Sequence, residues 1–169
     1  MKRDVKKLTL FANLLAIAII LNILESFITI IPVPGAKIGL ANIVTVMILV
    51  IYGPKESIYF VILRVILVAL LTGKLFNVIF YMSLSGGLFA SIGMAIIFKS
   101  SFFSLIGVSV IGSLAHTIGQ ILMAMLILST FTVVSYVPIM LLFSIPAGVV
   151  TGIISTRFVR VIKTVKNSQ

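Results

Sequence analysis

Cysteine and tryptophan are absent from the 169-residue sequence, which contains only one histidine and three acidic residues. Without cysteine the chain can form no disulfide, thiolate metal site or nucleophilic thiol. A single histidine excludes a metal site built from several histidines. Asp4, Glu25 and Glu56 are too far apart in sequence to supply the clustered carboxylates that hold Mg²⁺ against a diphosphate, or the carboxylate pair of a hydrolase. We therefore expect no enzyme activity, no metal and no cofactor.

Charged residues are also scarce, at 9% of the chain against about 25% in an average soluble domain. Hydrophobic residues make up 61%, and the mean hydropathy is +1.35. Several apolar runs exceed the roughly 18 residues that cross a hydrocarbon core. These values indicate a multi-pass protein of the cell membrane rather than a soluble domain. No Walker-type phosphate loop occurs, so the chain is not expected to hydrolyse ATP on its own.

Proline, glycine and charged residues interrupt the apolar pattern at regular intervals. The main breaks are Pro32–Gly35, Gly53–Lys55, Thr72–Lys74 and Lys99–Ser101, where proline disfavours helix before it and glycine turns freely. We predict a single all-α membrane domain, 1–169, with six transmembrane helices. Its expected spans are 8–31, 38–52, 56–71, 75–98, 102–129 and 136–159.

The thirteen basic residues predict the orientation, because lysine and arginine accumulate on the cytoplasmic side of short loops. With the N-terminus inside, only Lys37 and Lys74 lie outside, and Arg64 lies within a span. The even number of spans also places both basic ends on one side. We therefore expect both termini in the cytoplasm, and the charge gives no reason to expect a nucleic-acid partner. The inner set is Lys2, Arg3, Lys6, Lys7, Lys55, Lys99, Arg157, Arg160, Lys163 and Lys166.

Polar groups at membrane depth are costly, so each is a candidate for function. Polar residues from four expected spans lie at similar depth in the outer half of the membrane, which suggests an outward-facing pocket. His116 and Gln120 share one helix face there because they are four residues apart. The predicted substrate-binding residues are Glu25, Lys37, Asn42, Arg64, Asn77, His116 and Gln120.

Each of these residues also has a purely structural interpretation. Glu25 could bridge helices, neutralised by a proton or by Arg64, although a direct pair requires a tilted helix or a long reach by the guanidinium. His116 is interpreted first as a neutral imidazole satisfied by a neighbouring helix. The amide side chains could join helices by hydrogen bonds, and Lys37 could be a solvated loop charge.

Small residues mark surfaces where helix backbones can approach closely in a membrane. Glycines in the fourth and fifth spans favour packing inside the domain. Ala12 and Ala16, with Ala18, form a small-residue stripe on the first span. This stripe could equally dock another membrane subunit or pack inside the domain.

One stretch of the sequence is unusual for a membrane protein, and three others carry the same resemblance with it. They are Glu25-Ser26 followed by Pro32-Val33-Pro34-Gly35-Ala36-Lys37-Ile38-Gly39-Leu40-Ala41-Asn42, then Arg64-Val65-Ile66-Leu67, Ser83-Leu84-Ser85-Gly86-Gly87 and Ser113-Leu114-Ala115-His116-Thr117-Ile118-Gly119-Gln120. Over essentially the whole chain they resemble the Gx transporter family, also named heptaprenyl diphosphate synthase component I. That family is similar in turn to the S components of energy-coupling factor (ECF) transporters.

The resemblance implies a six-helix S component, the substrate-binding membrane subunit of an ECF-type importer. Such a subunit captures a small metabolite or vitamin-like compound and works with a transmembrane coupling subunit and two ATPase subunits. In S components an Ala-x-x-x-Ala stripe on the first span docks the coupling subunit, which would assign that role to Ala12 and Ala16.

The enzymatic name conflicts with the composition. Prenyl elongation needs Asp-rich motifs that bind Mg²⁺, whereas this chain has one aspartate. An alternative function is a non-catalytic membrane accessory protein linked to isoprenoid or quinone (heptaprenyl diphosphate) synthesis. A self-sufficient secondary transporter is a third hypothesis, but the inverted repeats and broken helices expected of it are not visible.

Overall fold

The computed structural model of the chain describes residues 2–27, 39–100 and 102–167. All regular structure in these ranges is helical, which confirms the all-α prediction. The elements are α1 (Lys2–Phe27), α2 (Leu40–Ile51), α3 (Pro54–Leu71), α4 (Val78–Lys99), α5 (Leu105–Leu128), the short 3₁₀-helix η1 (Phe131–Tyr136) and α6 (Val137–Asn167).

Four helical segments are long and apolar enough to cross a membrane. The other two helices differ from them in length or in charge. α2 has 12 residues and measures about 18 Å, well short of a hydrocarbon core of about 30 Å. α3 has 18 residues, but three of them, Lys55, Glu56 and Arg64, are charged. The four segments are Val5–Phe27, Val78–Lys99, Leu105–Leu128 and Val133–Ile162.

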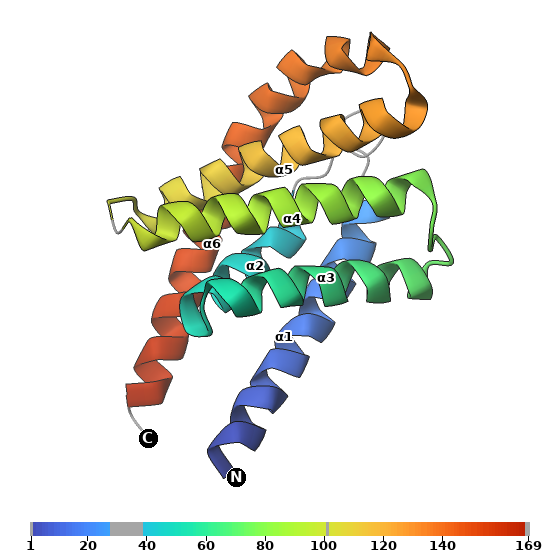
Figure 1. Cartoon of the computed structure of the whole chain (residues 1–169). Helices are drawn as coiled ribbons and strands as arrows, with labels where there is room; N and C mark the ends of the chain where they lie inside the picture. The colour runs from blue at the N-terminus through green and yellow to red at the C-terminus, as the bar shows by residue number, and fades with distance from the viewer. Residues whose placement is uncertain (1, 28–38, 101, 168–169) are drawn as a thin grey trace.

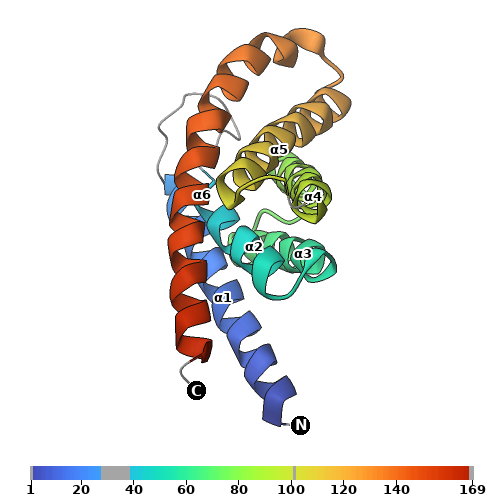
Figure 2. The same ribbon diagram turned by 90° about the vertical axis from the view of Figure 1, so that its left-hand side faces the viewer.

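α2 lies at the centre of the molecule. α3, α4 and α5 form one antiparallel layer, and α1 and α6 lie on the other side of α2 (Figures 1 and 2). α2 contacts every other α-helix, and residues 41–49 are all buried. A helix that is apolar on nearly all its faces and carries no charged residue is suited to such a position. The second apolar segment of the sequence is therefore the core helix of the fold.

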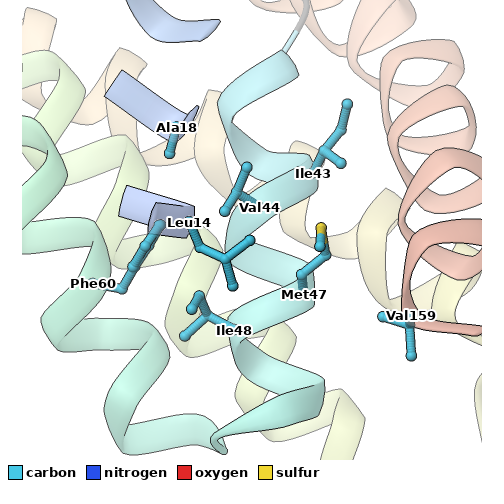
Figure 3. Close-up of a cluster of buried hydrophobic side chains, with 8 residues drawn as sticks. All are labelled: Leu14, Ala18, Ile43, Val44, Met47, Ile48, Phe60 and Val159. Atoms are coloured by element: carbon cyan, nitrogen blue, oxygen red, sulfur yellow. The ribbon is translucent and has the colours of Figure 1, made fainter. Parts of the chain in front are cut away.

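The packing around α2 is an interlocked set of aliphatic side chains with one phenylalanine (Figure 3). α2 contributes half of the set, and the remainder comes from α1, α3 and α6. Since lipid tails are as apolar as these side chains, close van der Waals contact rather than escape from water holds such helices together. The cluster consists of Leu14, Ala18, Ile43, Val44, Met47, Ile48, Phe60 and Val159.

Glycines bring α4, α5 and α6 into close contact. A Cβ atom added to Gly112 of α5 would lie 2.5 Å from Cγ of Met94 in α4. On α6, a Cβ at Gly148 would lie 2.6 Å from Cα of Val110, and one at Gly152 would lie 2.7 Å from Cα of Ile106. The glycines of α4 and α5 therefore serve internal packing, as expected. The Gly148-x-x-x-Gly152 pair does the same for α5 and α6, and it was not singled out from the sequence.

Several helix boundaries differ from the expected spans, among them the start of α1 at Lys2 and the start of α5 at Leu105. The fourth helix begins at Val78 rather than at Leu75, because Phe76 has a φ of 61° and Asn77 is an extended N-cap residue. The last helix continues from Val137 to Asn167, beyond the expected end at 159. Pro146 lies inside this helix, and Figure 2 shows its N-terminal, orange part inclined to the red part.

The beginning of α1 and the end of α6 lie at the same end of the molecule (Figures 1 and 2). This arrangement agrees with both termini being on one side of a membrane. Which side that is, and whether α2 and α3 also count as spans, stay predictions.

Candidate functional site

Buried polar side chains from α1, α2 and α3 gather near the start of α2. We call Glu25, Asn42, Thr45 and Arg64 the polar cluster. Glu25 and Arg64 are only 3% and 2% exposed, so two charged side chains lie inside a largely apolar molecule. Burial of a charge is expensive unless hydrogen bonds or an opposite charge compensate it, so their partners decide what the cluster can do.

Glu25 joins the end of α1 to the start of α2. Its Oε1 accepts a hydrogen bond from the backbone N–H of Gly39, the N-cap residue of α2. A carboxylate at this position also interacts favourably with the positive end of the helix dipole. Gly39 has a φ of 87°, which favours glycine, and a Cβ there would lie 3.4 Å from Nδ2 of Asn42. One role of Glu25 is therefore structural.

Arg64 connects α3 to α2. Its Nη1 donates a hydrogen bond to Oγ1 of Thr45 at 3.2 Å, and the Thr45 hydroxyl donates to the carbonyl of Ala41 at 3.3 Å. Arg64 also interacts electrostatically with Glu25, so the two buried charges compensate each other in part. Thr45 was not selected from the sequence. The only available signal was a hydroxyl in an otherwise apolar helix, three residues after Asn42.

Two consecutive glycines of α4 separate the polar cluster from α5. A Cβ at Gly87 would lie 2.6 Å from Cγ1 of Val61 and 3.8 Å from Nη2 of Arg64. A Cβ at Gly86 would lie 2.7 Å from Cγ of Gln120 and 2.9 Å from the carbonyl oxygen of His116. The absence of side chains at this point of α4 therefore allows α3 and α5 to approach it closely.

His116 and Gln120 form the α5 pair. Gln120 is buried and His116 partly buried, and both lie against Gly86. The neighbouring turn is fixed by a hydrogen bond of 2.9 Å from the Ser85 hydroxyl of α4 to the carbonyl of Gly119. The polar cluster and the α5 pair thus come from four helices. Arg64 of the cluster lies beside Gly87, and the α5 pair lies against Gly86, the preceding residue of α4.

Residues 14–158 match the sequence model of a family described as heptaprenyl diphosphate synthase component I. The chain belongs to this family. The matched range includes the polar cluster, both glycines of α4 and the α5 pair. No curated protein and no solved structure gives a significant match.

Asn77 and Lys37 are the other two predicted binding residues of this component I protein. Asn77 is exposed and precedes the first residue of α4. Its side chain makes no capping hydrogen bond, and its share in substrate binding stays a prediction. Lys37 falls outside the described residues.

The predicted docking residues Ala12 and Ala16 are exposed on α1, whereas Ala18 is buried against α2. The helical period separates them, because Ala12 and Ala16 are four residues apart and Ala18 is half a turn farther on. The exposed small-residue stripe of this component I protein is therefore limited to Ala12 and Ala16. In the described part of the chain, no group of three or more His, Cys, Asp or Glu residues could hold a metal ion.

Proposed function

We propose that the chain is the substrate-binding membrane subunit, or S component, of an ECF-type ABC importer. It would capture a small metabolite or vitamin-like compound in an outward-facing pocket and catalyse no reaction itself. The observation that carries the proposal is a pair of buried charges, Glu25 and Arg64, with Arg64 and the α5 pair lying against adjacent glycines of α4. Ionisable groups inside a membrane protein are costly and mark sites for a ligand, a proton or an ion.

The proposed site combines different kinds of binding group. Arg64 and Glu25 provide one charge of each sign, and Asn42, His116 and Gln120 provide neutral donors and acceptors. Lys37 and Asn77 complete the set as predicted from the sequence. Such a set suits a small polar molecule that is bound at several points, because each donor or acceptor fixes one part of its orientation.

The proposed partners follow from the resemblance to S components. Since it has no Walker loop, two ATPase subunits would hydrolyse ATP, and a transmembrane coupling subunit would connect them to this chain. All six helices would cross or enter the cell membrane, with both termini in the cytoplasm. Ala12 and Ala16 would form the docking surface, because exposed small side chains let another helix approach α1 closely.

The experiment that tests this function is purification of the tagged protein from its native membrane in a mild detergent. Proteomics would identify bound subunits, and mass spectrometry would identify any small molecule that the protein retains. We expect a coupling subunit, two ATPases and a bound metabolite. Recovery of a soluble prenyltransferase without these subunits would support the accessory role that the family description suggests, and would refute the transporter.

A pair of surface variants makes this test specific for the docking surface. Changing both Ala12 and Ala16 to tryptophan should remove the coupling subunit and the ATPases but leave the metabolite bound, because these residues lie on the outer face of α1. Ile96→Trp on α4 is the matched control, since Ile96 is 64% exposed and lies on another helix. It should retain all partners. If the variant changed at Ala12 and Ala16 also lost the metabolite, the change would have misfolded the protein rather than removed docking alone.

A further inference from the structure

The guanidinium group of Arg64 has a donor that none of the described residues uses. Nη1 donates to Thr45, but Nε–H is buried and has no hydrogen-bond partner in the described part of the chain. A buried donor without a partner costs about 1–3 kcal/mol, and more when the group is charged. Such a cost is rarely retained in a folded protein unless the group serves a function.

Other buried polar groups show how completely this fold can satisfy its donors. The hydroxyl of Ser155 donates to the carbonyls of Ile43 and Thr151, and Ser109 and Thr151 share a hydrogen bond of 2.7 Å between α5 and α6. The Ser57 hydroxyl at the start of α3 donates to Pro54. Arg64 lies in the middle of the same helix α3, so its free Nε–H is an exception to the local pattern.

The position of the free donor on the guanidinium indicates what could bind it. Nε–H and one N–H of Nη2 point the same way, along the edge that can bind two oxygens of one carboxylate or phosphate side by side. Thr45 uses Nη1, which belongs to the opposite side of the group. The Nη2 atom lies beside Gly87, where α4 has no side chain to cover it.

We propose that the Nε–Nη2 edge of Arg64 binds an oxyanion of the substrate, either a carboxylate or a phosphate group. This inference rests on the proposed function and narrows its substrate class to metabolites that carry such a group. Arg64 is then a specificity-determining residue. A guanidinium pairs with an oxyanion through two charge-assisted hydrogen bonds, which are roughly twice as strong as neutral ones. A substrate without an oxyanion would leave the buried Nε–H unpaired.

Small anions provide a direct test on the purified full-length protein after the retained metabolite has been removed by extensive washing in detergent. Sodium acetate and inorganic phosphate are added at an ionic strength matched with sodium chloride, and the midpoint of thermal unfolding is measured in detergent. At about ten times its dissociation constant, the anion that fits should raise the midpoint by about 3–6 °C. A response to acetate alone identifies a carboxylate site, and a response to phosphate alone identifies a phosphate site.

Two variants connect the response to the guanidinium edge. Arg64→Lys keeps the positive charge but lacks the planar pair of donors, so the response should disappear. Lys55→Gln removes an exposed cation from the start of the same helix and should respond like the unmodified protein. An unchanged response in Arg64→Lys, or no response to either anion in the unmodified protein, would overturn the proposal.

The metabolite that the unmodified protein retains gives a second test that needs no variant. If Arg64→Lys fails to fold, accurate mass and fragmentation of this metabolite still decide the matter. A compound with a carboxylate or phosphate supports the oxyanion site, whereas a compound with neither refutes it. In the second case the copurified coupling subunit and ATPases would still support the transporter, so the two proposals can fail separately.

Discussion

Replacing Gly86 by alanine tests how closely α4 must approach α5 for the site to assemble. The added Cβ would lie 2.7 Å from Cγ of Gln120 and 2.9 Å from the backbone oxygen of His116. The second distance is about 0.5 Å inside the shortest ordinary contact of 3.4 Å. The Gln120 side chain can rotate, but the His116 carbonyl can move only if α5 moves. The substitution should therefore displace the α5 pair.

The expected cost has two opposing parts. Overpacking of this kind costs about 1–3 kcal/mol, whereas replacing glycine by alanine within a helix gains about 0.8–1.0 kcal/mol. Gly93→Ala on the same helix has the same propensity gain, but its Cβ would lie 3.2 Å from Cβ of Ala115, a contact that requires a much smaller adjustment. The difference between the two variants isolates the steric cost. We expect Gly86→Ala to be less stable by about 1–3 kcal/mol, or about 5- to 150-fold in the unfolding equilibrium.

The measurement is unfolding in mixed micelles with increasing sodium dodecyl sulfate, followed by circular dichroism. The amount of retained metabolite per protein is measured on the same preparations by mass spectrometry. Gly93→Ala should be at least as stable as the unmodified protein and retain the metabolite, whereas Gly86→Ala should be less stable than Gly93→Ala and lose the metabolite. Equal stability of the two variants, with the metabolite retained in both, would show that α4 and α5 do not meet at Gly86 as described.

Two further predictions concern hydrogen bonds between helices. Thr45→Val preserves the shape of the side chain but removes the acceptor for Nη1 of Arg64, so it should destabilise the protein by about 1–3 kcal/mol in the same unfolding assay, while Thr45→Ser should retain most of the stability. If Thr45→Val left the free energy of unfolding unchanged, the hydrogen bond between α2 and α3 would not contribute to stability. A double-mutant cycle with Ser109→Ala and Thr151→Val should give a coupling energy of about 0.6 kcal/mol for the bond between α5 and α6, and additive effects would contradict that bond.

The sequence was sufficient for the large features because these depend on composition and local pattern. Apolar runs and their breaks indicated helices throughout, and glycines with positive φ do lie at the turns at Gly53 and Gly73. The predicted start of the fourth helix at Leu75 was wrong, because hydropathy values do not show where a helix is capped. Leu75 and Phe76 are apolar like the helix that follows, but the backbone turns before Val78.

The candidate site was predictable only in part. Glu25, Asn42, Arg64 and Gln120 stood out because they are polar in apolar segments, and all four are buried. Their partners could not be derived, because a hydrogen bond such as that from Arg64 to Thr45 depends on how two helices are placed in three dimensions.

By itself, then, the sequence determined the all-helical class, the apolar character suited to a membrane, the family and the rare polar residues inside the helices. Only the tertiary structure decided that α2 is the central helix, that Glu25 caps it, and that Gly86 and Gly87 lie against different neighbours. The physical reason is that lipid and protein interior are equally apolar. Hydropathy therefore indicates a helix without showing which of its faces contacts another helix. That face is determined by close packing of small residues.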